Sequence, residues 1–90
     1  MKSRTTANFW KRFEQLPAHL RDAATKQFRL WKADPAHPSV EFKPLRGLPH
    51  AYSARVTRDC RVVGRRYGDT IIWGWIGTHA EYDRLLKRRD

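Results

Sequence analysis

The chain has 90 residues, 40% of them hydrophobic, and its 19 Lys and Arg against 9 Asp and Glu give a formal net charge of +10. This length allows one domain with one modest core, residues 1–90, and the apolar content excludes an intrinsically disordered chain. The charge favours a polyanionic partner, above all nucleic acid, and the excess of Arg over Lys suits bidentate phosphate contacts.

The cysteine and histidine content excludes further classes of protein. Cys60 is the single cysteine, so we expect neither an intramolecular disulfide nor a thiolate zinc site. The histidines show no metal-ligand spacing, and we expect no metal and no other cofactor. The first ten residues lack the apolar segment of a signal peptide, and no run approaches the ~20 apolar residues of a membrane span. We therefore expect a cytoplasmic protein with no membrane contact.

The N-terminal third predicts a helical hairpin. Residues 2–6 predict a short edge strand or a frayed tail, and Asn8 is a plausible N-cap. Apolar residues then recur at helical spacing on both sides of Pro17, which is tolerated in the first turn of a second helix. The Asp34-Pro35 pair ends that helix. Two stripes predict the packed faces: Phe9, Trp10, Phe13 and Leu16, then Leu20, Ala23, Ala24, Gln27, Phe28, Leu30 and Trp31.

The remainder predicts strands followed by a short helix. Residues 40–45, 51–57, 60–66 and 71–76 are typical of strands, with a turn signal at residues 67–69. Helices first and a strand meander afterwards predict an α+β fold, in which a helical hairpin packs on one face of a small antiparallel sheet. Thr78 can cap a final short helix.

The hairpin between the second and third strands predicts a cationic site. A three-residue loop, Thr57-Arg58-Asp59, would pair Val56 with Cys60 and place Arg55 directly opposite Arg61. Asp59 would then occupy a position that often needs left-handed geometry, which Asp tolerates. A two-residue loop would turn Arg61 into the core, where an arginine is costly. Adjacent guanidiniums repel, so the three-residue loop predicts an anion site.

His79 is the strongest candidate for a reactive side chain. It follows a buried strand that ends at Gly77, and it is a residue type that changes charge near neutral pH. The alternative is that His79 only fills the first turn of a surface helix.

Four motifs follow one another along the chain: Lys43-Pro44-Leu45-Arg46-Gly47, Tyr52-Ser53-Ala54-Arg55-Val56, Arg61-Val62-Val63, and Gly77-Thr78-His79 followed by Tyr82. In this order they resemble the RelE/ParE superfamily of type II toxin–antitoxin toxins, and the resemblance covers nearly the whole chain. The similarity is greatest to the nuclease branch, whose members end in Gly-Thr-His or a similar sequence. Cys60 replaces the aromatic residue that usually precedes the third motif, and several nucleases have a basic residue or histidine where this chain has Ser53.

The resemblance implies a metal-independent endoribonuclease that cleaves mRNA on the ribosome and is neutralised by a cognate antitoxin. The 2′-hydroxyl would attack the neighbouring phosphate, with Arg55, Arg61 and Lys43 as the cationic clamp and His79 as general acid or base. It implies contacts with mRNA and rRNA, and with operator DNA only through the antitoxin. Further candidates are Tyr82, to stack on or orient a base, Asp59 or Glu81, to orient His79 or act as the base, and His50, as a second histidine.

Two other functions fit the same sequence. One is a toxin of the ParE branch, which inhibits DNA gyrase and cleaves no RNA, so that His79 would be incidental. The other is a basic RNA-binding module in which Arg55 and Arg61 hold phosphate without cutting it. In each case the final helix and the closing cluster Lys87-Arg88-Arg89 are available to an acidic antitoxin segment or to rRNA.

Overall fold

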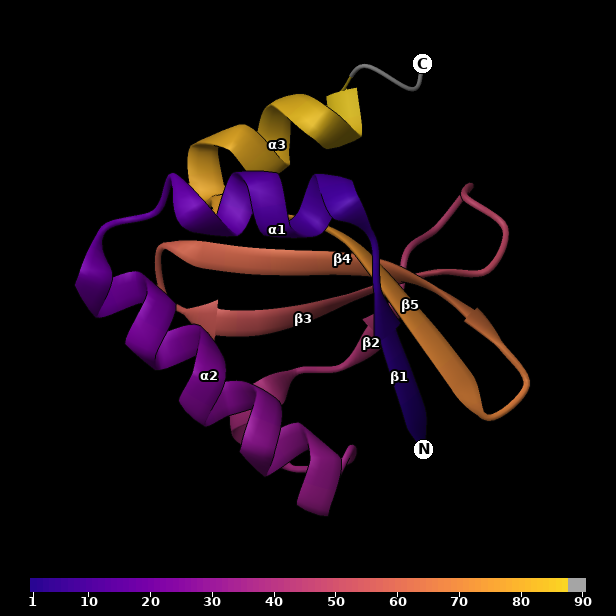
Figure 1. Cartoon of the computed structure of the whole chain (residues 1–90). Helices are drawn as coiled ribbons and strands as arrows, with labels where there is room; N and C mark the ends of the chain where they lie inside the picture. Colours follow the sequence, from indigo (N-terminus) through magenta and orange to yellow (C-terminus); the bar gives the residue numbers. More distant parts are fainter. Residues whose placement is uncertain (88–90) are drawn as a thin grey trace.

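The computed structural model describes residues 1–87, so Arg88 and Arg89 of the predicted basic cluster lie outside the described residues. Within these residues, three α-helices and five strands form an α+β fold, as the sequence predicts (Figure 1). In chain order the elements are β1 (Lys2–Thr5), α1 (Ala7–Glu14), α2 (Ala18–Ala33), the 3₁₀ helix η1 (Pro38–Val40), β2 (Lys43–Pro44), β3 (Ala51–Thr57), β4 (Cys60–Tyr67), β5 (Thr70–Thr78) and α3 (His79–Lys87).

The five strands form one sheet in the order β1-β5-β4-β3-β2. Strands β2 to β5 are antiparallel to their neighbours, as predicted, whereas β1 runs parallel to β5 and makes the sheet mixed. The N-terminal segment is therefore an edge strand and not a frayed tail.

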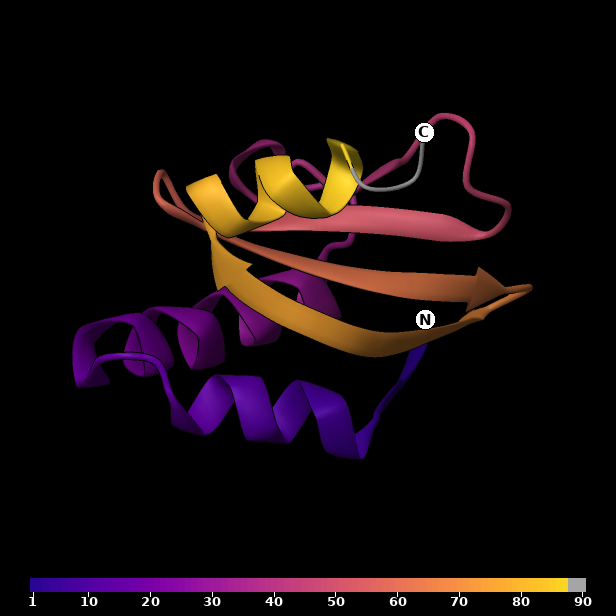
Figure 2. The ribbon, with the colours of Figure 1, turned by 90° about the horizontal axis from the view of Figure 1, so that it is seen from above.

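The helices lie on both faces of the sheet, as the view from above shows (Figure 2). The hairpin of α1 and α2 covers one face, and α3 covers the other. The N-cap of α1 is Thr6, whose side chain accepts from the Phe9 amide, and not Asn8. Asn8 instead donates to the Gly74 carbonyl at the edge of β5 that β1 leaves open. Helix α1 thereby covers an edge that would otherwise expose unpaired backbone groups.

The main core lies between the helical hairpin and the sheet. Its largest fully buried side chains include Trp31 and Ile71, and Trp31 meets Trp73 edge-on at 5.5 Å between ring centroids. Two residues of the predicted stripes are exposed, Trp10 by 48% and Phe28 by 43%. No helix in the described part of the chain is long and apolar enough to cross a membrane.

The predicted strand over residues 40–45 is mostly replaced by turns. Pro38 begins η1, and Glu41 then adopts a left-handed conformation with φ 48° and ψ 47°. Only two residues, Lys43 and Pro44, pair with β3. Proline has no N–H group to donate to a strand neighbour, so this strand remains short and at the edge.

Two register shifts determine which side chains reach which face. One lies between Arg55 and Thr57, and the other places Gly74 as an extra residue between Trp73 and Trp75. Residues two apart on a regular strand share a face. The extra residue in β5 instead sends Trp73 to the hairpin core and Trp75 to the α3 face, where it lies 6.4 Å from the Tyr82 ring.

Candidate functional site

The arginine pair that the sequence predicts is present in β3 and β4, but a different loop produces it. Arg55 lies directly opposite Arg61, whereas Thr57, and not Val56, pairs with Cys60. The turn has two residues, Arg58 and Asp59, and the bulge at Val56 restores the register. The expected left-handed geometry of Asp59 was wrong, since the non-glycine residues with positive φ among residues 1–87 are Glu41 and His50.

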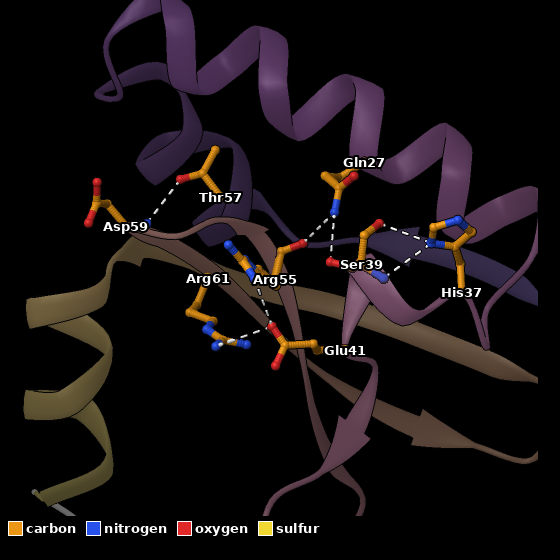
Figure 3. A network of polar contacts seen from close by, with 8 residues as sticks. All are labelled: Gln27, His37, Ser39, Glu41, Arg55, Thr57, Asp59 and Arg61. Carbon is orange, nitrogen blue, oxygen red and sulfur yellow. Dashed lines mark hydrogen bonds and ion pairs between the residues drawn. The ribbon is translucent and has the colours of Figure 1, made fainter.

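A carboxylate that the sequence analysis missed lies between the two guanidiniums (Figure 3). The Oε2 atom of Glu41 is 3.4 Å from Nη1 of Arg55 and 3.8 Å from Nη2 of Arg61. The sequence offered one weak signal, an acidic residue two positions before Lys43 in a mostly basic segment. The repulsion of the arginine pair is therefore partly offset within the chain.

Arg61 is the most enclosed cation of this face. Its side chain is 15% exposed, and its guanidinium carbon lies 5.9 Å from the centroid of the Tyr82 ring on α3. Its Nε and Nη1 atoms are buried and have no hydrogen-bond partner among the described residues. A buried guanidinium with unused donors favours an oxyanion, because charged groups are costly to bury without full pairing.

Lys43 and Ser53 form the neighbouring row of the same face, one pair along the strands from the two arginines. They are paired across β2 and β3, so their side chains share the face of Arg55. Lys43 is exposed, whereas Ser53 is fully buried and its hydroxyl has no partner in the described part of the chain. The predicted clamp of Lys43, Arg55 and Arg61 therefore lies on one face, with Glu41 inside it.

His79 is the first residue of α3, and its backbone and side chain face different partners. The backbone N–H donates to the Asp59 carbonyl at 2.7 Å, which ties α3 to the turn between β3 and β4. The half-exposed imidazole lies 3.6 Å from the Asp83 carboxylate and 6.0 Å from the Tyr82 ring. Asp83, one helical turn after His79, is therefore its carboxylate neighbour, and the i,i+4 spacing could have indicated this.

The Glu81 carboxylate pairs with Thr78 and Arg12 rather than with the His79 imidazole. It accepts from the Thr78 amide at 2.9 Å, while the Thr78 hydroxyl accepts from the Glu81 amide, and this reciprocal capping starts α3. Its carboxylate also lies 3.2 Å from the Arg12 guanidinium. The hydrogen bond from the Thr78 backbone, supported by Arg12 and opposed by partial burial, holds the pKa of Glu81 below its ordinary value of 4.5.

The remaining candidates are placed as follows. Tyr82 is buried, and it contacts both Arg61 and His79. The Asp59 carboxylate is exposed at the turn, where the Asp59 backbone and not its carboxylate holds His79. His50 stacks on Tyr67 with 4.8 Å between ring centroids, at the far end of β3, roughly 20 Å from the turn by strand rise. The structure does not bring His50 to the other candidates.

Other groups near this face offer no reactive thiolate and no group of metal ligands. Burial, together with the negative charge of Glu81, raises the pKa of the Cys60 thiol from 9.0 to about 11. Within residues 1–87, no three His, Cys, Asp or Glu side chains group closely enough to hold a metal ion. The face therefore presents the cations with Glu41 between the two arginines, the His79 imidazole beside Asp83, and the buried Tyr82.

Comparison with protein families now identifies the chain. Residues 18–84, well over half of its length, match the family described as the ParE-like toxin domain. The chain belongs to this family. It is a toxin of the RelE/ParE type, and no curated protein sequence matches it significantly.

Solved structures show that the toxin has the fold of this superfamily. A chain of the RelB–RelE antitoxin–toxin complex from Methanococcus jannaschii has a TM-score of 0.74 at 17% identity, covering 91% of this chain and 96% of that one. The YoeB/ParE toxin from Agrobacterium tumefaciens has a TM-score of 0.67 at 24% identity, with coverages of 88% and 99%. The isolated RelE toxin from E. coli has a TM-score of 0.65 at 18% identity, with coverages of 99% and 98%.

Proposed function

We propose that this toxin is a metal-independent endoribonuclease that cleaves mRNA on the ribosome and so inhibits translation. The observation that carries the proposal is the Arg61 guanidinium, which has unused donors and contacts the same tyrosine, Tyr82, as His79 does. Cation and imidazole are the two kinds of group that phosphodiester cleavage through a 2′-hydroxyl requires.

The proposed chemistry proceeds through a pentacoordinate phosphorane. The ribose 2′-hydroxyl loses its proton as its oxygen attacks the adjacent phosphorus, and a 2′,3′-cyclic phosphate forms. The bond from phosphorus to the 5′-oxygen breaks as that oxygen takes up a proton and leaves as a hydroxyl. Arg61 and Arg55 stabilise the added negative charge, and Lys43 binds a neighbouring phosphate. His79 transfers a proton as general acid or base, typically a contribution of about 10²–10⁴-fold. DNA lacks the 2′-hydroxyl and is not cleaved by this route.

We propose a cognate antitoxin as the protein partner. Several similar structures are toxin–antitoxin complexes, including those from Methanococcus jannaschii and Mycobacterium tuberculosis. The groove between α1, α2 and β1 is lined by the exposed rings of Trp10 and Phe28 and by Arg4. Exposed aromatic residues beside a cation, on a chain of net charge +10, fit an acidic amphipathic segment of the antitoxin.

A second candidate function is inhibition of DNA gyrase without RNA cleavage. The specific observation in its favour is that the family that matches residues 18–84 is described as the ParE-like toxin domain. In that case the arginine face would bind a protein or DNA, and His79 would have no chemical role. Relief of growth arrest by extra gyrase would favour this function.

The deciding experiment is expression of the wild type and of His79→Ala in growing cells, with mRNA ends mapped by primer extension. His19→Ala, which replaces an exposed histidine on α2, is the matched control. The nuclease proposal predicts growth arrest and new cuts inside translated messages for the wild type and the control, and neither for His79→Ala. Growth arrest with intact messages and an equally toxic His79→Ala variant would refute the nuclease function.

A further inference from the structure

The carboxylate of Glu41 occupies the place where an anion would bridge the two arginines. A single oxygen, Oε2, approaches both Arg55 and Arg61, as Figure 3 shows. A phosphate oxygen bound by the same two guanidiniums would need that position. The chain therefore supplies its own anion to a site that also fits a phosphate.

The surrounding segment holds Glu41 there against its local backbone preference. Left-handed φ and ψ angles are uncommon for residues other than glycine, asparagine and aspartate. The preceding η1 is tied down by Gln27 of α2, which donates to the Ser39 carbonyl at 3.3 Å and to the Arg55 carbonyl at 3.0 Å. The His37 side chain accepts from the Ser39 amide at 3.1 Å. Tertiary contacts, and not helical or strand geometry, thus place this carboxylate.

The contacts that Glu41 makes are weak enough to be exchanged. Distances of 3.4 Å and 3.8 Å exceed the 2.7–2.9 Å of strong charge-assisted hydrogen bonds. The Glu41 and Arg55 side chains are 35% and 41% exposed, so water screens part of the attraction. Nε and Nη1 of Arg61 remain unused in the described chain while Glu41 is bound. An RNA phosphodiester carries the same single charge on two non-bridging oxygens, and both can accept hydrogen bonds, whereas Glu41 approaches the arginines with Oε2 alone.

We propose that Glu41 is an internal competitor that sets the affinity of this toxin for RNA phosphate. In the absence of RNA it keeps Arg55 and Arg61 together, and it leaves the guanidiniums when a phosphate binds. A polyanion that reaches only one arginine would not displace it, so Glu41 also disfavours loosely bound anions. The assignment of the anion as RNA phosphate rests on the proposed function, whereas the competition itself does not.

The test measures binding of a fluorescein-labelled single-stranded RNA 12-mer whose riboses are 2′-O-methylated, so that cleavage cannot occur. Glu41→Gln removes the competing charge at similar size, and Glu14→Gln makes the same change in net charge at an exposed position of α1. We expect the Kd to fall about tenfold for Glu41→Gln, equivalent to about 1.4 kcal/mol, and less than about twofold for Glu14→Gln. Equal effects of the two substitutions, or weaker binding by Glu41→Gln, would overturn the proposal.

Two further variants keep the test decisive. Glu41→Asn removes the charge with a residue that tolerates the left-handed region, and it replaces Glu41→Gln if that variant does not fold by circular dichroism. In a background that carries both Arg55→Met and Arg61→Met, Glu41→Gln should no longer lower the Kd, because the competitor acts on these two guanidiniums. A gain that persists would assign the effect to general charge and reject the competition. Because the probe cannot be cleaved, failure of the nuclease proposal with His79→Ala leaves this result interpretable.

Discussion

The two faces of the sheet differ in what their side chains are paired with. On the hairpin face, Trp31, Ile71 and Trp73 are buried against one another and against other apolar residues. Among residues 1–87, the buried side-chain polar atoms without a partner are the indole Nε1 of Trp31 on the hairpin face and, on the α3 face, the Ser53 hydroxyl with Nε and Nη1 of Arg61. Apolar packing on the hairpin face stabilises the fold, whereas the α3 face has hydrogen-bonding groups of Arg61 and Ser53 without a partner among residues 1–87. The apolar core and the proposed binding site thus lie on opposite faces of the sheet.

The largest effect is expected from the hairpin face. Trp73→Ala removes an indole that packs on Trp31 and Phe42, and burial losses of this size cost about 3–5 kcal/mol. Thermal unfolding should show a fall in Tm of more than about 10 °C at this domain size. The matched control is Trp10→Ala, since Trp10 is half-exposed and we expect a loss of about 1 kcal/mol. Similar losses for both variants would contradict the assignment of the core.

The opposite result is expected from the α3 face. Arg61→Met keeps the aliphatic packing and removes a buried cation with unused donors, so stability should stay unchanged or rise. Affinity for the uncleavable RNA should fall tenfold or more, because the most enclosed cation of the clamp is lost. Arg58→Met in the exposed turn is the charge-matched control for binding. A large fall in Tm for Arg61→Met would show that the α3 face also stabilises the fold.

The start of α3 should depend on pH through Glu81. Since the folded state lowers the pKa of Glu81, its charge contributes stability above about pH 4.5, and this contribution is lost as pH falls through the lower folded-state pKa. Glu81→Gln keeps a side chain that can cap the helix but removes its charge. Glu81→Ala removes the cap and the charge, and we expect it to lower the free energy of unfolding by about 1 kcal/mol, as is typical of caps. Thermal unfolding from pH 7 to pH 3 should show less acid destabilisation in both variants than in the wild type. A wild-type profile retained by Glu81→Gln would contradict this role.

The smallest effect concerns Cys60. Because its folded-state pKa is raised from 9.0 to about 11, its contribution to stability is complete below pH 9 and is lost as pH rises toward 11. Alkylation by iodoacetamide at pH 8 should be much slower in the folded protein than in urea, and Cys60→Ala should remove the signal. Rapid labelling of the folded chain would show that the thiol is accessible.

The sequence predicted those parts of the fold that depend on periodicity and local chemistry. The helical hairpin, three of the long strands, the cap at Thr78 and the facing arginines all follow from residue spacing. The bulge at Val56 was missed because two arrangements place Arg55 opposite Arg61. One is a three-residue turn without a bulge, and the other is a two-residue turn with one extra residue in β3. The burial of Trp10 was overestimated because an apolar stripe shows which side of a helix packs on the protein, but not how much of that side is covered.

The partners of the charged residues could not be predicted. Glu41, Arg12 and Asp83 each pair with a candidate residue, and the first two do so across elements distant in sequence. Such pairs depend on how a loop or helix edge meets the sheet, which no local pattern encodes. Only the pair of His79 and Asp83 has a local signature, the i,i+4 spacing on one helix.

Strand β1 has a consequence for how the molecule is made. It pairs with residues 70–73, and α1 bonds to carbonyls at the far end of β5 and to Glu81. During synthesis β1 and α1 must therefore wait until residues 70–81 have been made before they find their partners. A nascent or prematurely ended chain has no finished sheet, no α3 and no His79. The pairing of β1 with β5 is therefore a late step of folding during synthesis.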